Sequence, residues 1–105
     1  MIKHIVAWKF KESAENADRE TNIARAKKMI EGLKDVVPGM GVFEVGLPDP
    51  GDPDAFDMLL YSEFADRESL RAYVKHPEHV KAADFVRKVR LTRGVIDYES
   101  GGAKR

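Results

Sequence analysis

Regular alternation of apolar and polar side chains marks the start of the chain. Successive side chains of a β-strand point to opposite faces, so residues 2–10 are predicted to form a strand. Its two faces carry Ile2, His4, Val6, Trp8 and Phe10, and Lys3, Ile5, Ala7 and Lys9. We expect the first set to pack against helices, because it is the more apolar one.

Three more segments have strand character. Residues 40–47 form a glycine-containing candidate, and residues 48–54, rich in proline, glycine and aspartate, are expected to form a loop. Residues 93–99 are predicted to form the last strand. Residues 55–64 alternate, and one face of that segment carries Phe56, Met58, Leu60, Ser62 and Phe64.

Residues 11–18 are polar and are expected to form a loop or a frayed helix start. Helical spacing of apolar residues then predicts the first helix, and Pro38 and Gly39 are expected to end it. The apolar positions are Ile23, Ala26, Ile30, Leu33 and Val37.

A second helix is expected after Asp66, which can cap it, with Leu70, Tyr73 and Val74 pointing inward. His76 and Pro77 break this helix, and Pro77 can begin a third helix that runs to about residue 88.

This order of elements, β-α-β-β-α-β, predicts an α+β, ferredoxin-like fold with an antiparallel sheet and helices on one face. Residues 1–100 would be one domain and residues 101–105 a flexible C-terminal tail. The uncovered sheet face would carry Ile5, Ala7, Leu59, Tyr61, Ile96 and Tyr98. A second copy is the simplest cover for such a patch, which favours a homodimer, a dimeric α+β barrel. A monomer with one wet sheet face is the alternative.

Charge and composition limit the classes of molecule that the chain is expected to bind. The 18 basic residues balance the 18 acidic ones, so there is no general electrostatic reason to bind nucleic acid or an anionic membrane. There is no cysteine, which excludes disulfides and thiolate zinc sites. Neither a signal peptide nor an apolar stretch of about 20 residues is evident, and we expect a cytoplasmic protein.

Candidate chemistry gathers around the helix break. Tyr73 lies on the buried stripe of its helix, and His79 falls on one face with Ala83 and Val86. Strand parity turns Asp97 toward the helices, where His4 or His79 could pair with it. A histidine held by a carboxylate beside a tyrosine hydroxyl suits general acid–base catalysis. The same spacing also fits a purely structural polar cluster, in which His76 caps a helix.

Metal and cofactor binding are not indicated. His76 and His79 are three residues apart, and although a triad with Asp97 can be drawn, their spacing does not place them on one helix face. No glycine-rich phosphate-binding motif is present. We expect no metal and no cofactor.

Several segments carry a family resemblance. They are residues 4–11, 37–40, 44–46, 60–64, 73–80 and 95–98, of which His76-Pro77-Glu78-His79 after Tyr73 is the most specific. In these the chain resembles the stress-responsive A/B barrel domain (Dabb) family of the dimeric α+β barrel superfamily.

The resemblance implies a homodimer with a small pocket between sheet and helices. A plant polyketide cyclase among similar proteins uses the residues matching His79 and Tyr73 for an aldol closure, and its strand aspartate and first-strand histidine match Asp97 and His4. Ala26 and Ile30 replace aromatic pocket residues of that enzyme. The expected substrate-binding residues are His4, Val6, Trp8, Ile30, Met58, Leu60 and His76.

Two functions follow as hypotheses. The first is a cofactor-free acid–base enzyme of the cyclase, isomerase or lyase type, acting on a small carbonyl or phenolic compound. The second is a non-catalytic stress or ligand-binding protein with a structural His/Asp/Tyr cluster. A cofactor-free monooxygenase is a third reading, which no residue supports specifically.

Overall fold

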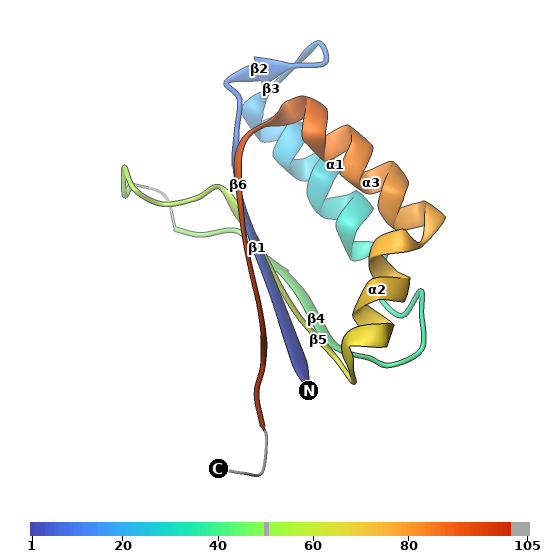
Figure 1. Cartoon of the computed structure of the whole chain (residues 1–105). Helices are drawn as coiled ribbons and strands as arrows, with labels where there is room; N and C mark the ends of the chain where they lie inside the picture. Colours follow the sequence, from blue (N-terminus) through green and yellow to red (C-terminus); the bar gives the residue numbers. More distant parts are fainter. Residues whose placement is uncertain (50, 102–105) are drawn as a thin grey trace.

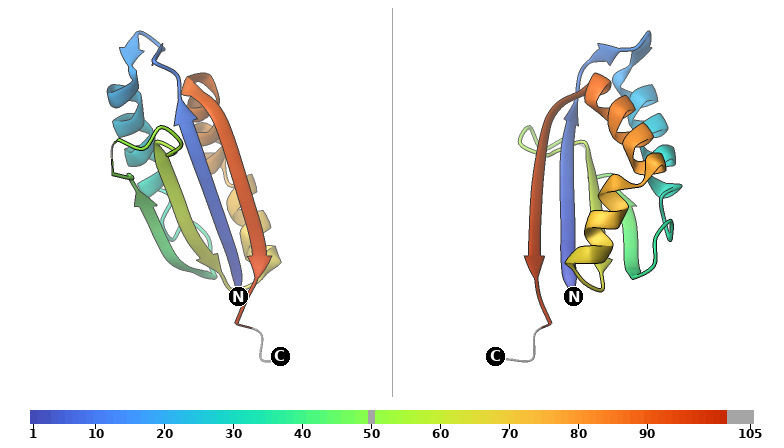
Figure 2. Two further views of the ribbon diagram at one scale, coloured as in Figure 1. Left: turned by 90° about the vertical axis from the view of Figure 1, so that its left-hand side faces the viewer. Right: turned by 45° about the vertical axis from the view of Figure 1, so that its right-hand side comes forward.

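A four-stranded antiparallel sheet forms one layer of the molecule and helices form the other (Figures 1 and 2). The computed structural model describes residues 1–49 and 51–101. The strand order is β4-β5-β1-β6, with β1 at Ile2–Phe10, β4 at Met40–Gly46, β5 at Met58–Phe64 and β6 at Arg90–Glu99. The helices are α1 (Arg19–Glu31), α2 (Arg67–Lys75) and α3 (Pro77–Val89), and all lie on one sheet face. The predicted α+β ferredoxin-like fold is confirmed.

The inner face of the sheet is built from cross-strand neighbours with the predicted parity. Val6 pairs with Leu60 on β5 and Val95 on β6, and all three point to the helix side. Burial alternates strictly along β1. The core therefore sits between this face and the helices, and its largest fully buried side chains include Phe10, Met58, Phe64, Tyr73 and Val89.

Helix boundaries agree with the sequence at some ends and differ at others. Asp66 caps α2 as predicted, its carboxylate accepting from the Ser69 N–H at 2.8 Å. The first helix, however, ends at Glu31 and not near Pro38, with Gly32 as its C-cap. Leu33 stays buried beyond it because its N–H bonds to the Ile30 carbonyl at 2.9 Å and keeps the chain turning against the core. Val74, expected to point inward, is 44% exposed.

Two smaller differences lie outside the helices. The segment predicted as a loop before α1 holds a short hairpin, β2 (Ser13–Ala14) with β3 (Ala17–Asp18). The third predicted strand begins at Met58, three residues late, and the last begins at Arg90, three residues early. The expected tail at residues 102–105 lies outside the described residues.

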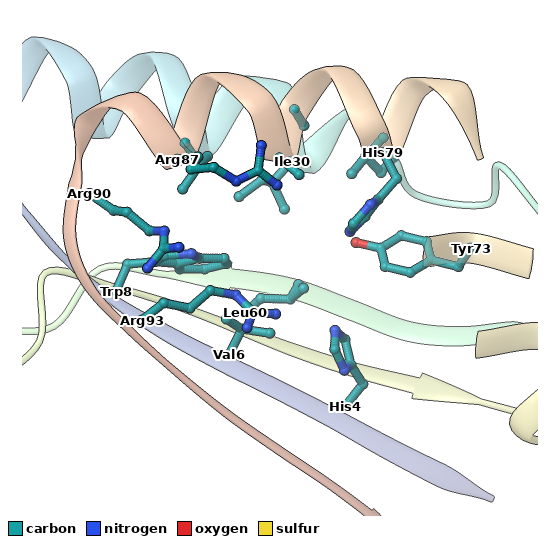
Figure 3. A pocket seen from close by; sticks show the side chains of 14 residues that line it. His4, Val6, Trp8, Ile30, Leu60, Tyr73, His79, Arg87, Arg90 and Arg93 are labelled. Carbon is teal, nitrogen blue, oxygen red and sulfur yellow. The ribbon is translucent and has the colours of Figure 1, made fainter. Parts of the chain in front are cut away.

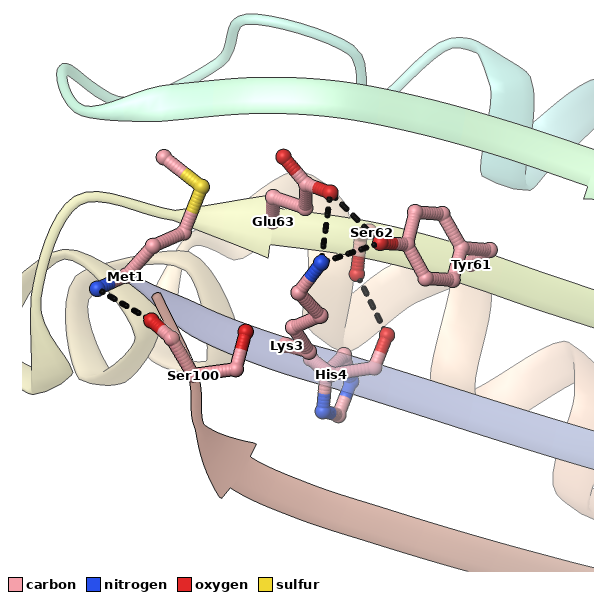
Figure 4. Close-up of polar contacts among 7 residues, drawn as sticks. All are labelled: Met1, Lys3, His4, Tyr61, Ser62, Glu63 and Ser100. Atoms are coloured by element: carbon pink, nitrogen blue, oxygen red, sulfur yellow. Dashed lines mark hydrogen bonds and ion pairs between the residues drawn. The ribbon is translucent and has the colours of Figure 1, made fainter. Parts of the chain in front are cut away.

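The outer face of the sheet is left bare by the helices. Ile5 pairs with Tyr61 and Ile96 across the strands, and Ile96 is 61% exposed. A polar cluster closes one end of this face (Figure 4): the Tyr61 hydroxyl donates to Glu63 at 2.5 Å, and Lys3 Nζ lies 3.0 Å from that hydroxyl. The hydrogen bonds from Tyr61 and then Lys3 hold the pKa of Glu63 below its usual range.

The turn before β4 generates a stability prediction. Gly39 has φ +86°, and a Cβ there would lie 2.3 Å from Ser69 Oγ at the start of α2. We expect Gly39→Ala to lower the free energy of unfolding by about 1–3 kcal/mol, from both backbone strain and this clash. Gly46→Ala is the control, because no atom lies within 4 Å of its Cβ position. Urea unfolding measures both, and equal stability of the two variants would contradict the prediction.

Candidate active site

A cavity of about 310 Å³ lies between the inner face of the sheet and the helices (Figure 3). Side chains from β1, β5, β6 and all three helices contribute to its wall. The lining residues are His4, Val6, Trp8, Ile30, Leu33, Leu60, Tyr73, His79, Ala82, Ala83, Val86, Arg87, Arg90 and Arg93. Two histidines and a tyrosine form one end, Arg90 lies at the other, and Arg87 and Arg93 reach between them toward the apolar side chains of Ile30 and Leu60.

His4 is held in place by Asp97. These residues face each other across the β1–β6 ladder, and the His4 Nδ1 lies 2.5 Å from the Asp97 Oδ1. A carboxylate acceptor assigns the proton to Nδ1, which leaves Nε2 as the nitrogen available to the cavity. The Asp97 side chain is 39% exposed and does not line the cavity itself. Asp97 therefore acts on the site only through His4, whose ring it holds in place.

Tyr73 places its hydroxyl between the two histidines. Its ring centroid lies 4.7 Å from that of His79 and 6.2 Å from that of His4. The residue is 1% exposed, yet within the described part of the chain its hydroxyl has no hydrogen-bond partner and points into the cavity (Figure 3). Burial raises the pKa of this phenol, so Tyr73 stays protonated and can donate to a ligand.

His79 is the half-buried member of the cluster. Burial lowers the pKa of its imidazole, and the nearby His4 and Arg93 lower it further, against a hydrogen bond from the ring to the Val74 backbone. The neutral ring is therefore the favoured form near pH 7 and can accept a proton.

The remaining predicted site residues divide into two groups. Val6, Trp8, Ile30 and Leu60 line the cavity, and their role in substrate binding stays a prediction. Two expectations need correction. Met58, the first residue of β5, is fully buried in the core. His76 is occupied as the N-cap of α3, its Nδ1 accepting from the Glu78 N–H at 3.1 Å. Neither side chain lines the cavity.

The three lining arginines went unnoticed in the sequence. A signal for one of them was available, because Arg90 continues the stripe of His79, Ala83 and Val86 at helical spacing. Arg93 pairs with Trp8, so it lies on the inner parity of β6.

The described residues, 1–49 and 51–101, contain no group of three histidine, aspartate or glutamate side chains that could hold a metal ion. None of their helices has the length and apolar character needed to cross a bilayer.

Comparison with known proteins gives the family. The model of the Stress responsive A/B Barrel Domain matches residues 2–100. The chain belongs to this family. No curated protein matches the sequence.

Solved structures with the A/B barrel family fold are similar over nearly the whole chain. A dimeric ferredoxin-like protein of unknown function from Bacteroides fragilis is 29% identical, with TM-score 0.76, covering 94% of this chain and 95% of that one. A Dabb family protein from Mesorhizobium loti is 26% identical, with TM-score 0.65 and coverage of 96% and 97%. The hydroxynitrile lyase from Passiflora edulis shares the fold at 19% identity, with TM-score 0.73 and coverage of 92% and 90%.

The environment of His79 predicts how stability of this A/B barrel chain depends on pH. Because its folded-state pKa is lowered, the unfolded chain binds a proton first as pH falls through about 6.5, and the folded state is penalised. We expect the free energy of unfolding to decline from about pH 7.5 to pH 5, and His79→Gln to flatten that decline. Urea unfolding at several pH values tests this. Identical pH slopes for the two proteins would contradict it, as would an NMR titration placing the His79 pKa above 6.5.

Proposed function

We propose that this chain is a cofactor-free acid–base enzyme acting on a small carbonyl or phenolic compound. One observation carries the proposal: a neutral His79, the protonated Tyr73 hydroxyl, which has no partner among the described residues, and the Asp97-held His4 meet at one end of a cavity that also has an apolar wall. An apolar cavity with a few convergent polar groups of perturbed pKa is the usual form of an active site.

The proposed chemistry begins with proton abstraction next to a carbonyl. A nitrogen of His79 takes a proton from the α-carbon, and the C–H electron pair becomes an enolate while His79 becomes an imidazolium. The Tyr73 hydroxyl donates to the oxygen on which negative charge develops. The enolate then attacks a second carbonyl carbon, expels a leaving group or is reprotonated elsewhere, which corresponds to cyclase, lyase or isomerase activity.

His4 is assigned the second proton-handling position. With Nδ1 committed to Asp97, its Nε2 can accept or return a proton on the opposite side of Tyr73 from His79. A carboxylate behind an imidazole fixes the ring orientation and tautomer, which is what a repeated proton transfer requires.

The fold is compatible with such chemistry, since the Passiflora edulis neighbour is a lyase. The competing function is ligand binding without catalysis, which is favoured by the direct satisfaction of His4 by Asp97. Both functions use the same cavity, so they are separated by turnover.

A homodimer is the second part of the proposal. The outer sheet face presents large apolar side chains, Ile96 being 61% exposed, and helices cover only the other face. The similar Bacteroides fragilis protein is dimeric. A second copy of this sheet would bury Ile5, Leu59, Tyr61 and Ile96, each large side chain contributing about 1.5–3 kcal/mol. A cytoplasmic location, without nucleic-acid or membrane partners, fits the balanced charge and the lack of cysteine.

Enzymatic function predicts exchange of α-protons with solvent. In D2O, the protein should speed deuterium incorporation into a simple phenyl-substituted alkyl ketone such as benzylacetone, followed by NMR. We expect His79→Ala to abolish the acceleration and Tyr73→Phe to reduce it about 10²-fold, since an oxyanion donor is lost. His76→Ala is the matched control, because that ring lies outside the cavity wall. Acceleration by His79→Ala equal to that of the wild type would refute the assignment.

The dimer predicts a defined mass in solution. Sedimentation at micromolar concentration should give one species at twice the 11.8 kDa chain mass. Ile96→Lys should yield monomer, because a charge would be buried between the sheets. Val80→Lys makes the same change at an exposed position on α3 and should leave the dimer intact. A wild-type monomer would rule out this part of the proposal.

A further inference from the structure

Three arginines line the cavity on the side of Trp8: Arg90 lies farthest from the histidines, and Arg87 and Arg93 reach toward Ile30 and Leu60 (Figure 3). Arg87 extends from α3, Arg90 lies where α3 passes into β6, and Arg93 lies on β6 opposite Trp8 (Figure 3). Their neighbours in the wall are apolar, among them Trp8, Val6 and Leu60. Within the part of the chain that the structure describes, no aspartate or glutamate lines the cavity.

Among residues 1–49 and 51–101, only one of these three arginines is paired with a carboxylate. Arg87 pairs with Asp84 at 2.7 Å on the same helix, at an exposed position. Arg90 and Arg93 have no carboxylate within 4.0 Å among residues 1–49 and 51–101. Arg90 is half-buried, whereas Arg87 and Arg93 are exposed. A guanidinium group favours an oxyanion that accepts two parallel N–H donors.

We propose that Arg90 and Arg93 bind an oxyanionic group of the substrate, with Arg87 adding to the positive field. The substrate class is then an organic acid, a carboxylate or a phosphate or phosphonate, with an apolar body and a carbonyl at its far end. Binding of the anion stands on the arginines alone, whereas the role of the far carbonyl rests on the proposed acid–base function.

The geometry of β1 sets the length of this substrate. His4 and Trp8 share a face and are four residues apart, so their backbones are separated by about 13 Å at ~3.3 Å per residue. Arg93 pairs with Trp8 and reaches into the cavity, which shortens the gap to be bridged. The cavity volume of about 310 Å³ equals that of about ten water molecules at ~30 Å³ each. A single ring with a short side chain meets both limits.

Matched ligands test the proposal by titration calorimetry at low salt. The probes are hydrocinnamate, its neutral amide, and 2-phenylethylphosphonate, which share one phenylethyl group and differ in the polar group. We expect at least one anion to bind the wild type about tenfold or more tightly than the amide, because charge-assisted bonds are the stronger ones. Which anion binds better distinguishes carboxylic acids from phosphorus acids.

Arginine variants localise the effect. The anion preference should vanish in Arg90→Gln/Arg93→Gln, with amide binding unchanged, and Arg71→Gln, on α2 and outside the wall, should keep it. Arg93→Lys retains the charge but loses the paired N–H donors of the guanidinium group, so it should lose only part of the anion preference. This single variant also tests the proposal if the double variant fails to fold. Neither anion binding better than the amide, or a preference surviving in the folded double variant, overturns the inference.

Anion binding and deuterium exchange distinguish the arginine site from the proposed enzymatic function. If anions bind through the arginines but the protein gives no deuterium exchange, the anion site stands and the enzyme hypothesis falls. If exchange depends on His79 while the arginine variants change nothing, the reverse holds.

Discussion

The alternation of side chains along β1 is the constraint on which the rest of the structure depends. This strand lies inside the sheet, pairs with both β5 and β6, and carries members of both ends of the cavity on one face: His4 near the histidine end and Trp8 near the arginines. A register slip of one residue would turn Lys3 and Ile5 toward the helices and expose the core set. The apolar residues that secure the register, Val6 and Phe10 among them, therefore also position the site.

The place of β6 at the sheet edge explains the partner of His4. Directly opposite residues in an antiparallel pair lie about 5 Å apart, which brings Asp97 to His4 and leaves His79, on a helix, without a carboxylate. An edge position also leaves Asp97 partly hydrated, so its charge costs less than it would in the closed core. The outcome is two histidines in different settings: one held by an anion at the edge, the other depressed in pKa by burial.

Much of this arrangement could be predicted from sequence, because it follows from local patterns. Period-two alternation gave the faces of β1, β5 and β6, and Asp66 gave the start of α2. The end of α1 could not be found in this way, since the apolar spacing continues through Leu33 and Val37 although the chain leaves the helix at Gly32. Helical spacing also predicted wrongly that Val74 on α2 points inward, whereas this side chain is exposed. The meeting of the three arginines at the cavity could not be predicted, because it depends on both the β1–β6 register and the packing of α3. Neither of these is determined by the sequence of one segment alone.

Charge along β6 gives the cavity a direction. On the inner parity of this strand, Arg93 lies opposite Trp8, and Asp97 lies opposite His4, with Val95 between them. An anionic ligand entering with its charge toward Arg93 gains attraction, whereas the reversed ligand would place its charge beside the Asp97 carboxylate. The same strand that holds His4 in position thus disfavours the wrong orientation. A substrate anchored in the favoured direction would present its uncharged end to Tyr73 and the two histidines, where the Tyr73 hydroxyl could donate to the oxygen of a developing enolate.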